Sequence, residues 1–429
     1  MTKRITRRHT LALAGSLGVA SALGESAEAA ERVLYVLCHR VHELCLTTGV
    51  AGNLTLPWQK REHARIVWTT FDTNPLEDRL FRECSLGRTE FAVGYLVNSR
   101  ATPNIALLFQ DLYSYQKRLP IEDFGDFAPN LVKTMTIDGK LIGIPVRTAT
   151  MSLFYNEGLL EQRRIKAPPT TLEELVSQAK ELTFRPSGGA PVIGMAMASS
   201  LAVFPVTFMR AYGGDFITPD LKLLPNPSVL VKTLTLLHGM FKDGSLPRSF
   251  ATMSNDDQVT WLQQGRAAFT LLPFARYQQL NDPKETRFPG KLTAIEFPMS
   301  EMLKGKVAMA SPVEFWAMSI PANSVAKDLG WSFIQAMSSK AITLGAALNG
   351  NGPARLSTFT DPRFTKSYPL AHVEAQALAT GRVPLPAFPK AAQAQAIFLE
   401  EVQLAVLGRK SAEAATESVL KRVQPLLPA

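Results

Sequence analysis

Continuous apolar runs alternate with segments of helical period in the first quarter of the chain. The run at 33–38 is continuously apolar, and 64–70 and 91–97 are predicted as the second and third strands. Strands that are covered on both faces show this pattern, whereas half-exposed strands alternate. The segment 76–86 between two of the runs carries charges at helical spacing and predicts a helix. The run at 33–38 is typical of a parallel strand in an α/β sheet.

The middle of the chain predicts a strand, an extended crossing, a second strand and a helix. An apolar run at 141–144 is expected to stop at Pro145, because proline lacks the N–H that a sheet requires. A second apolar run follows at 151–155. Thr171 and Glu174 then form the spacing of a capping box, which marks a helix start. Later segments predict helices at 105–115, 391–407 and 411–426.

The same middle stretch carries a set of short sequence pieces in a fixed order. The pieces are Asp138-Gly139-Lys140, Gly143, Pro145, Tyr155-Asn156, Leu159, Pro168-Pro169-Thr170 and Glu173-Glu174. Together they resemble the extracellular solute-binding protein family 1, the sugar-type receptors of ABC importers. The resemblance covers residues 120–429 well and 31–119 loosely. It departs from the family at 313–316, where Val-Glu-Phe-Trp stands in place of the usual glycines.

The resemblance implies the fold class, the domains and the function. We expect an α/β protein with the two-lobe, type II periplasmic binding protein-like fold and a ligand cleft between the lobes. The expected division gives 31–146 plus 274–322 to the N-terminal lobe and 147–273 plus 323–429 to the C-terminal lobe. The implied function is the periplasmic substrate-binding component of an ABC importer, which binds a sugar or oligosaccharide by hinge closure. The implied partners are a carbohydrate and the membrane permease subunits, with the receptor itself a monomer.

Seven residues are the candidates for contact with the ligand. His39 and Arg40 follow the first predicted strand, and Ser99 and Arg100 follow the third. Side chains at the carboxyl ends of parallel strands line the cleft of open α/β sheets. Arg147 follows the crossing proline, and the resemblance adds the aromatic residues Phe274 and Trp316. Each has a structural alternative: the aromatics can be core residues, Arg147 an interlobe ion pair, and the others surface or structural groups.

The first 30 residues predict a targeting segment instead of a folded element. Lys3, Arg4, Arg7 and Arg8 precede a weakly apolar run, and Ala27-Glu28-Ala29 forms a small-x-small cleavage site. The paired arginines are typical of twin-arginine export to the periplasm, although Thr10 stands where that motif prefers an aromatic residue. Sec export therefore remains the alternative route. No later stretch reaches the roughly 18 apolar residues of a membrane span.

The charge distribution and the absence of catalytic motifs argue against nucleic-acid binding and enzyme activity. The net charge of +9 is scattered without a basic run, which argues against a nucleic-acid partner. The chain has no HExxH or CxxC, and its one GxSxG-like string falls in 14–18, within the targeting segment. We therefore expect no enzyme activity, metal or cofactor. A receptor for a sugar acid, polyamine or iron is the alternative. Cys38 is expected to be a packed thiol, with a bridge to Cys45 left open.

Overall fold

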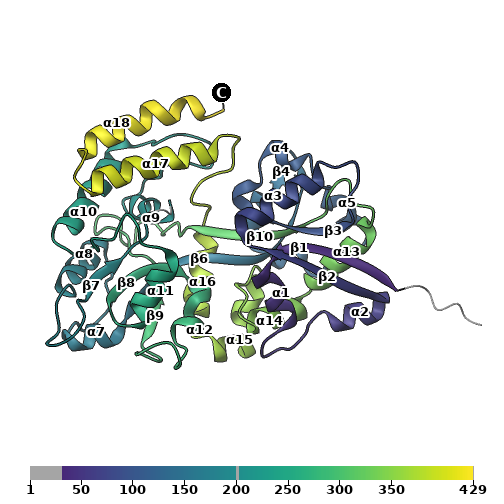
Figure 1. Cartoon of the computed structure of the whole chain (residues 1–429), viewed down its shortest axis with the longest axis horizontal. Coiled ribbons are helices and arrows are strands. Elements are labelled where there is room, and N and C mark those ends of the chain that lie inside the picture. The colour runs from purple at the N-terminus through teal and green to yellow at the C-terminus, as the bar shows by residue number, and fades with distance from the viewer. Residues whose placement is uncertain (1–30, 200–201, 429) are drawn as a thin grey trace, which may run out of the picture.

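The computed structural model describes residues 31–199 and 202–428, which form two lobes side by side (Figure 1). One sheet runs through both lobes. Its strand order is β2 (Ala64–Phe71), β1 (Arg32–His39), β3 (Phe91–Val97), β10 (Val313–Ser319), β6 (Ile144–Asn156), β8 (Ala267–Pro273) and β7 (Ile193–Ala196). β9 (Leu292–Ile295) also pairs with β6, and β4 (Thr136–Ile137) pairs with β5 (Lys140–Leu141). The predicted α/β class is confirmed.

Helices cover the sheet in each lobe. The first-lobe helices before the crossing are α1 (Arg40–Thr47), α2 (Leu56–Glu62), α3 (Thr73–Cys84), α4 (Pro103–Ala106), α5 (Leu112–Arg118) and α6 (Pro129–Thr134). After the crossing follow α7 (Glu157–Gln162), α8 (Leu172–Glu181), α9 (Val203–Ala211), α10 (Pro227–Lys242), α11 (Asn255–Gln263) and α12 (Tyr277–Leu280). The last group is α13 (Lys327–Met337), α14 (Lys340–Leu348), α15 (Pro362–Ser367), α16 (Ala371–Thr380), α17 (Ala391–Val406) and α18 (Ala412–Val423).

The long strand β6 belongs to both lobes. Its first half pairs with β10, and its second half pairs with β8 on one edge and β9 on the other. The predicted stop at Pro145 is therefore wrong. Pro145 lies opposite Ala317, where the register shifts next to Trp316. An irregularity in the ladder is one of the places where a sheet tolerates the missing N–H of proline.

Two hydrophobic clusters form the cores of the two lobes. Leu34, Leu96 and Trp331 are buried in the first cluster, while Leu153 and Phe208 are buried in the second. The clusters divide the chain differently from the sequence prediction. Helices α13 to α16 pack in the first cluster, although 323–429 was expected in the second lobe. After Phe274 the chain contacts both parts of the molecule: Phe274 and Leu292 pack in the first cluster, while β9 pairs with the second half of β6.

Local signals explain where several elements begin and end. The Thr171 hydroxyl accepts a hydrogen bond from the backbone N–H of Glu174 at 3.1 Å, which confirms the predicted start of α8. The predicted helix at 105–115 is wrong and splits into α4 and α5. The backbone N–H of Gln110 donates to the carbonyl of Ile320, a contact that the local pattern cannot reveal. Asp111 then caps α5 as a new start.

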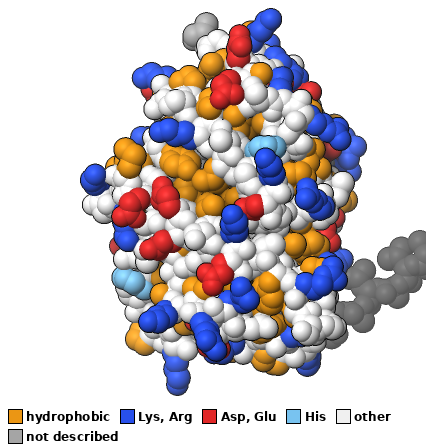
Figure 2. All heavy atoms as spheres, turned by 90° about the vertical axis from the view of Figure 1, so that its left-hand side faces the viewer, with side chains coloured by type: hydrophobic (Ala, Val, Ile, Leu, Met, Phe, Trp, Pro, Cys, Tyr) orange, Lys and Arg blue, Asp and Glu red, His pale blue; other side chains and the backbone are white. Residues whose placement is uncertain are grey.

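The cysteines and surface charges follow the sequence expectations. Cys38, Cys45 and Cys84 are buried free thiols, so Cys38 and Cys45 are not bridged. Burial raises the pKa of the Cys45 thiol to about 11, which keeps it protonated. The outer face of the second lobe shows Lys and Arg spread among Asp and Glu around a central group of hydrophobic side chains (Figure 2).

Candidate functional site

Strands β6 and β10 run side by side through the region between the lobes (Figure 1). In this ladder Trp316 lies opposite Arg147, and Glu314 lies opposite Ala149. All four side chains retain solvent contact. Their neighbours on the other face are buried: Val313, Phe315, Thr148 and Thr150. Side chains of interior strands are exposed only where nothing packs on them, so these four residues form a solvent-facing floor between the lobes, here called the interlobe floor.

Aromatic rings gather at one end of the interlobe floor. The Trp316 ring lies 5.0 Å from the ring of His42 and 6.4 Å from that of His39, centroid to centroid. His42 in turn stacks on Tyr95 at 4.4 Å. Since His42 and Tyr95 are buried, they support Trp316 from below and leave part of its ring open to solvent. A flat, partly open indole held by packed neighbours is a suitable surface for stacking a ligand.

His39 joins the end of β1 to the start of α1. Its Nδ1 accepts a hydrogen bond from the backbone N–H of Val41 at 3.2 Å, so the imidazole caps the helix. Burial lowers the pKa of His39, and the charges of Arg147 and Arg40 act in the same direction. The imidazole is therefore neutral near pH 7. Its Nε2 lies 3.7 Å from Oδ1 of the exposed Asp72, at the end of β2.

Arg147 turns from the interlobe floor toward the loop after α14. Its Nη1 donates to Oδ1 of Asn351 at 2.9 Å, and Nδ2 of Asn351 donates to the carbonyl of Val146 at 2.7 Å. Arg147 also lines a cavity of about 20 Å³ with His42, whose Nε2 has no hydrogen-bonding partner among residues 31–199 and 202–428. Such a cavity has room for about one water molecule. Burial lowers the pKa of Arg147, and the charge of Arg276 adds to this effect.

The structure brings three of the seven candidate residues together, namely His39, Arg147 and Trp316. Arg40 is exposed on the first turn of α1, next to this group. Ser99 and Arg100 are exposed on the short turn after β3, and that turn is fixed to β10 because the Asn98 side chain accepts from the backbone N–H of Phe315 at 2.7 Å. Phe274 is fully buried in the first core, which is the structural alternative stated for it.

Glu314 is the polar residue of the interlobe floor that sequence reasoning did not select. Its side chain is exposed, and within residues 31–199 and 202–428 it has no hydrogen-bonding or ion-pair partner. Desolvation by the surrounding protein nevertheless raises the pKa of the carboxyl group. The sequence feature that could have identified Glu314 is the presence of a charged residue within the apolar run 311–320.

Two α/β lobes that share one crossing strand, with an open aromatic and polar floor between them, define a two-lobe solute-binding protein. The model of the bacterial extracellular solute-binding protein family matches residues 65–372. The chain belongs to this family. It is a family of binding proteins for transport. In the described part of the chain, no helix has the length and apolarity needed to cross a membrane.

Sequence relatives and solved structures agree with this assignment. A Deinococcus radiodurans "Probable ABC transporter-binding protein" is 25% identical over 38% of this chain and 40% of its own length. A Sinorhizobium fredii protein described as a "Probable amino-acid ABC transporter periplasmic-binding protein" is 23% identical over 68% of this chain. The chain thus spans 40% and 65% of these two relatives.

Among solved structures, maltose-bound MalE3 of T. maritima has a TM-score of 0.75 at 20% identity, covering 92% of this chain and 100% of that one. A solute-binding protein of Agrobacterium radiobacter K84 in complex with ribitol has a TM-score of 0.76 at 21% identity, covering 92% and 98%. A third, from Agrobacterium vitis S4 with bound D-mannitol, has a TM-score of 0.73 at 16% identity, covering 93% and 100%. These likenesses confirm the two-lobe fold.

Proposed function

We propose that this chain is the periplasmic solute-binding component of an ABC importer and that it holds a sugar or polyol between its lobes. The observation that carries the proposal is the interlobe floor, where the Trp316 ring is partly open beside polar groups. Carbohydrates combine a flat apolar ring face with hydroxyl groups, so they suit a site with both features. Maltose, ribitol and D-mannitol, the ligands of three structures of the same fold, support this class.

The crossing segments supply a mechanism for lobe closure. Arg210 on α9 is buried, and its guanidinium donates to the carbonyls of Ala310, Arg382 and Val383. It is also paired with Asp215 at 3.1 Å. These bonds fix two crossing segments to the second lobe, so closure would bend the chain on the first-lobe side of them. A ligand that contacts both lobes favours the closed state by its extra contacts.

A sugar acid is the alternative ligand within the same fold. Its carboxylate would require an arginine fork, and Arg147 is the candidate on the interlobe floor. However, its Nη1 already donates to Asn351, and Glu314 lies on the same face of the sheet. An anionic ligand would therefore meet an unfavourable carboxylate. This arrangement favours a neutral ligand. The repulsion is weaker for an amino acid, because its positively charged amino group offsets its carboxylate.

The cellular setting is part of the proposal. Delivery to the periplasm by the twin-arginine route rests on Arg7 and Arg8, which lie outside the described residues. The partners would be the permease subunits of the importer, which a monomeric receptor would approach with both lobes. The family of extracellular solute-binding proteins supports an exported receptor.

A thermal-shift screen of the mature chain, residues 31–429, tests the ligand class. The panel would contain maltose, ribitol, D-mannitol, D-tagatose, D-galacturonate, putrescine and the common amino acids. A ligand present at a thousand times its dissociation constant adds roughly 4 kcal/mol to the free energy of unfolding. A saturable shift with a sugar or polyol, and none with amino acids, supports the proposal. A saturable shift with an amino acid alone would replace the carbohydrate assignment.

A further inference from the structure

Among the strands of the described chain, Glu314 is the one acidic residue. It lies on β10, an interior strand whose flanking residues Val313 and Phe315 are only 1% exposed. Its own side chain is exposed, and the carboxylate has no protein partner in the described chain. An unpaired carboxylate at the centre of a sheet brings no packing and no ion pair. Its position therefore calls for an explanation outside folding stability.

The neighbours of Glu314 on the interlobe floor indicate what it can bind. Trp316 is two positions further along the same strand, so both side chains project from one face. Ala149 lies directly opposite Glu314 on β6 and leaves space above the strand. A carboxylate accepts hydrogen bonds through two oxygens and matches two adjacent hydroxyl groups. A polyhydroxylated ligand that lies against the open indole would thus present hydroxyl groups to Glu314.

We propose that Glu314 is a specificity-determining residue that accepts hydrogen bonds from adjacent hydroxyl groups of the ligand and selects neutral polyhydroxylated ligands over acids. The inference rests on the proposed function, because it assumes that the interlobe floor binds the solute. Arg147, Arg40 and the cap residue His39 lie at the other end of the floor. The positive charges of Arg147 and Arg40 disfavour a cationic ligand, just as Glu314 disfavours an anionic one. A neutral ligand meets neither penalty.

Titration calorimetry of wild type, Glu314→Gln and Glu181→Gln tests the assignment on residues 31–429. Glutamine keeps the size of the side chain but loses the negative charge and one acceptor oxygen. Glu181 is exposed at the end of α8, far along the chain from β10, and serves as the matched control. The probes are maltose, ribitol, D-mannitol, D-tagatose, D-galacturonate and D-glucosamine. Because Glu314 is exposed, Glu314→Gln is expected to fold, and circular dichroism would verify this.

We expect wild type to bind a neutral probe most tightly, and Glu314→Gln to bind that probe at least fivefold more weakly, since hydrogen bonds to charged groups are the stronger ones. Glu181→Gln should stay within twofold of wild type. An effect of Glu314→Gln below fivefold overturns the inference and leaves the receptor function standing. Tightest wild-type binding of D-galacturonate or D-glucosamine also overturns it. If no probe binds wild type, the carbohydrate function fails, and this inference fails with it.

Discussion

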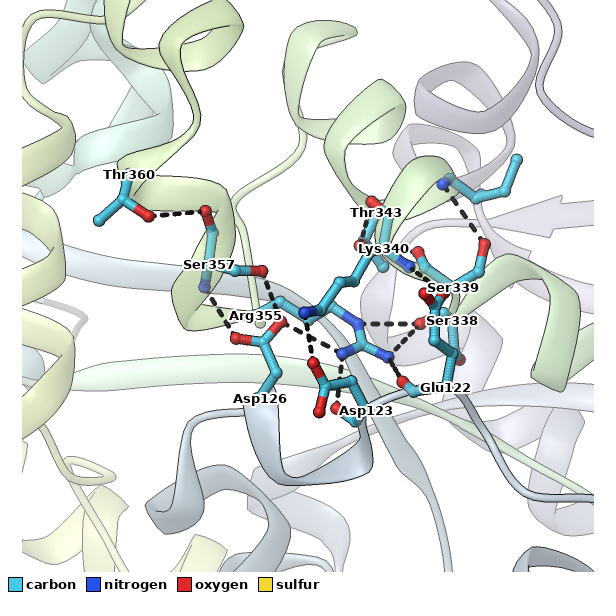
Figure 3. Close-up of polar contacts among 11 residues, drawn as sticks. Glu122, Asp123, Asp126, Ser338, Ser339, Lys340, Thr343, Arg355, Ser357 and Thr360 are labelled. Carbon is cyan, nitrogen blue, oxygen red and sulfur yellow. Dashed lines mark hydrogen bonds and ion pairs between the residues drawn. The ribbon is translucent and has the colours of Figure 1, made fainter.

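The guanidinium of Arg355 lies 3.2 Å from the carboxylate of Asp126, although the two residues are 229 positions apart in the sequence. Arg355 has no exposed surface. Its remaining N–H groups donate to the carbonyls of Glu122, Asp123 and Ser338, as Figure 3 shows. The guanidinium therefore joins the turn before α6 to the junction of α13 and α14, helices that also pack in the first cluster.

Replacing Arg355 with methionine should lower the free energy of unfolding by about 3–5 kcal/mol, because it leaves the Asp126 carboxylate and several buried carbonyls without their donor. Urea denaturation followed by circular dichroism measures the change. The control is Arg363→Met, whose exposed pair with Asp361 should contribute little. Equal denaturation midpoints for the two variants would show that the Arg355 network does not stabilise the lobe.

Glu374 predicts a pH dependence of stability. Burial raises the pKa of its carboxyl group from 4.5 to about 7, while Tyr368 donates to it at 2.7 Å. The folded state thus binds this proton more tightly than the unfolded state. The stabilisation that comes from this bound proton has its full value below pH 4.5. It falls by up to about 3 kcal/mol as the pH rises through 7.

Glu374→Gln should remove this loss, because a glutamine does not titrate. Urea unfolding of both proteins at pH 5 and pH 8 measures the difference. The variant should gain stability relative to wild type at the higher pH. Parallel pH profiles for the two proteins would contradict the assigned shift.

Arg147→Ala should weaken binding of the ligand about 3- to 10-fold if the ligand is neutral, since one hydrogen bond contributes roughly 1 kcal/mol. For a sugar acid the loss should reach orders of magnitude, because a buried charge pair is broken. Titration calorimetry at two salt concentrations separates the cases. Arg409→Ala, at an exposed position after α17, is the control. A dissociation constant within about twofold of wild type would mean that Arg147 only holds Asn351.

Export can be tested by changing the paired arginines. Arg7→Lys together with Arg8→Lys should leave the protein in the cytoplasm, because the twin-arginine receptor reads both guanidinium groups. Cell fractionation and immunoblotting measure the periplasmic yield. The control is Lys3→Arg, which keeps the charge of the segment and leaves the pair intact. An unchanged periplasmic yield of the double variant would assign export to the Sec route.

The strands were predictable from sequence where burial is continuous. β3 has the predicted bounds because every residue between Phe91 and Val97 packs against the core or is partly covered. The helix at 105–115 failed because a contact between Gln110 and Ile320 interrupts it. The packing of α13 to α16 in the first cluster also depends on contacts far apart in the sequence. The bonds of Arg355 that hold α13 and α14 in the first lobe reach residues more than two hundred positions away.

The candidate site was predictable only in part. His39 follows from its place at the end of a parallel strand, which fixes it at the sheet edge. The approach of Trp316 to His39 requires the antiparallel insertion of β10 beside β3, which no local pattern encodes. Phe274 is as apolar as a cleft aromatic, yet it is fully buried, and only packing separates the two cases. Glu314 was not selected from the sequence, because its role depends on the exposure of its side chain on an interior strand, which only the folded structure shows.

Small-angle scattering of residues 31–429, with and without a saturating concentration of the ligand found in the screen, tests the central claim most directly. Two lobes that close on a solute should give a smaller radius of gyration in the bound state, because contacts from both lobes favour the closed form. Calorimetry on the same samples would establish saturation. Identical scattering curves at saturation would contradict the account, since the solute would then bind without bringing the lobes together.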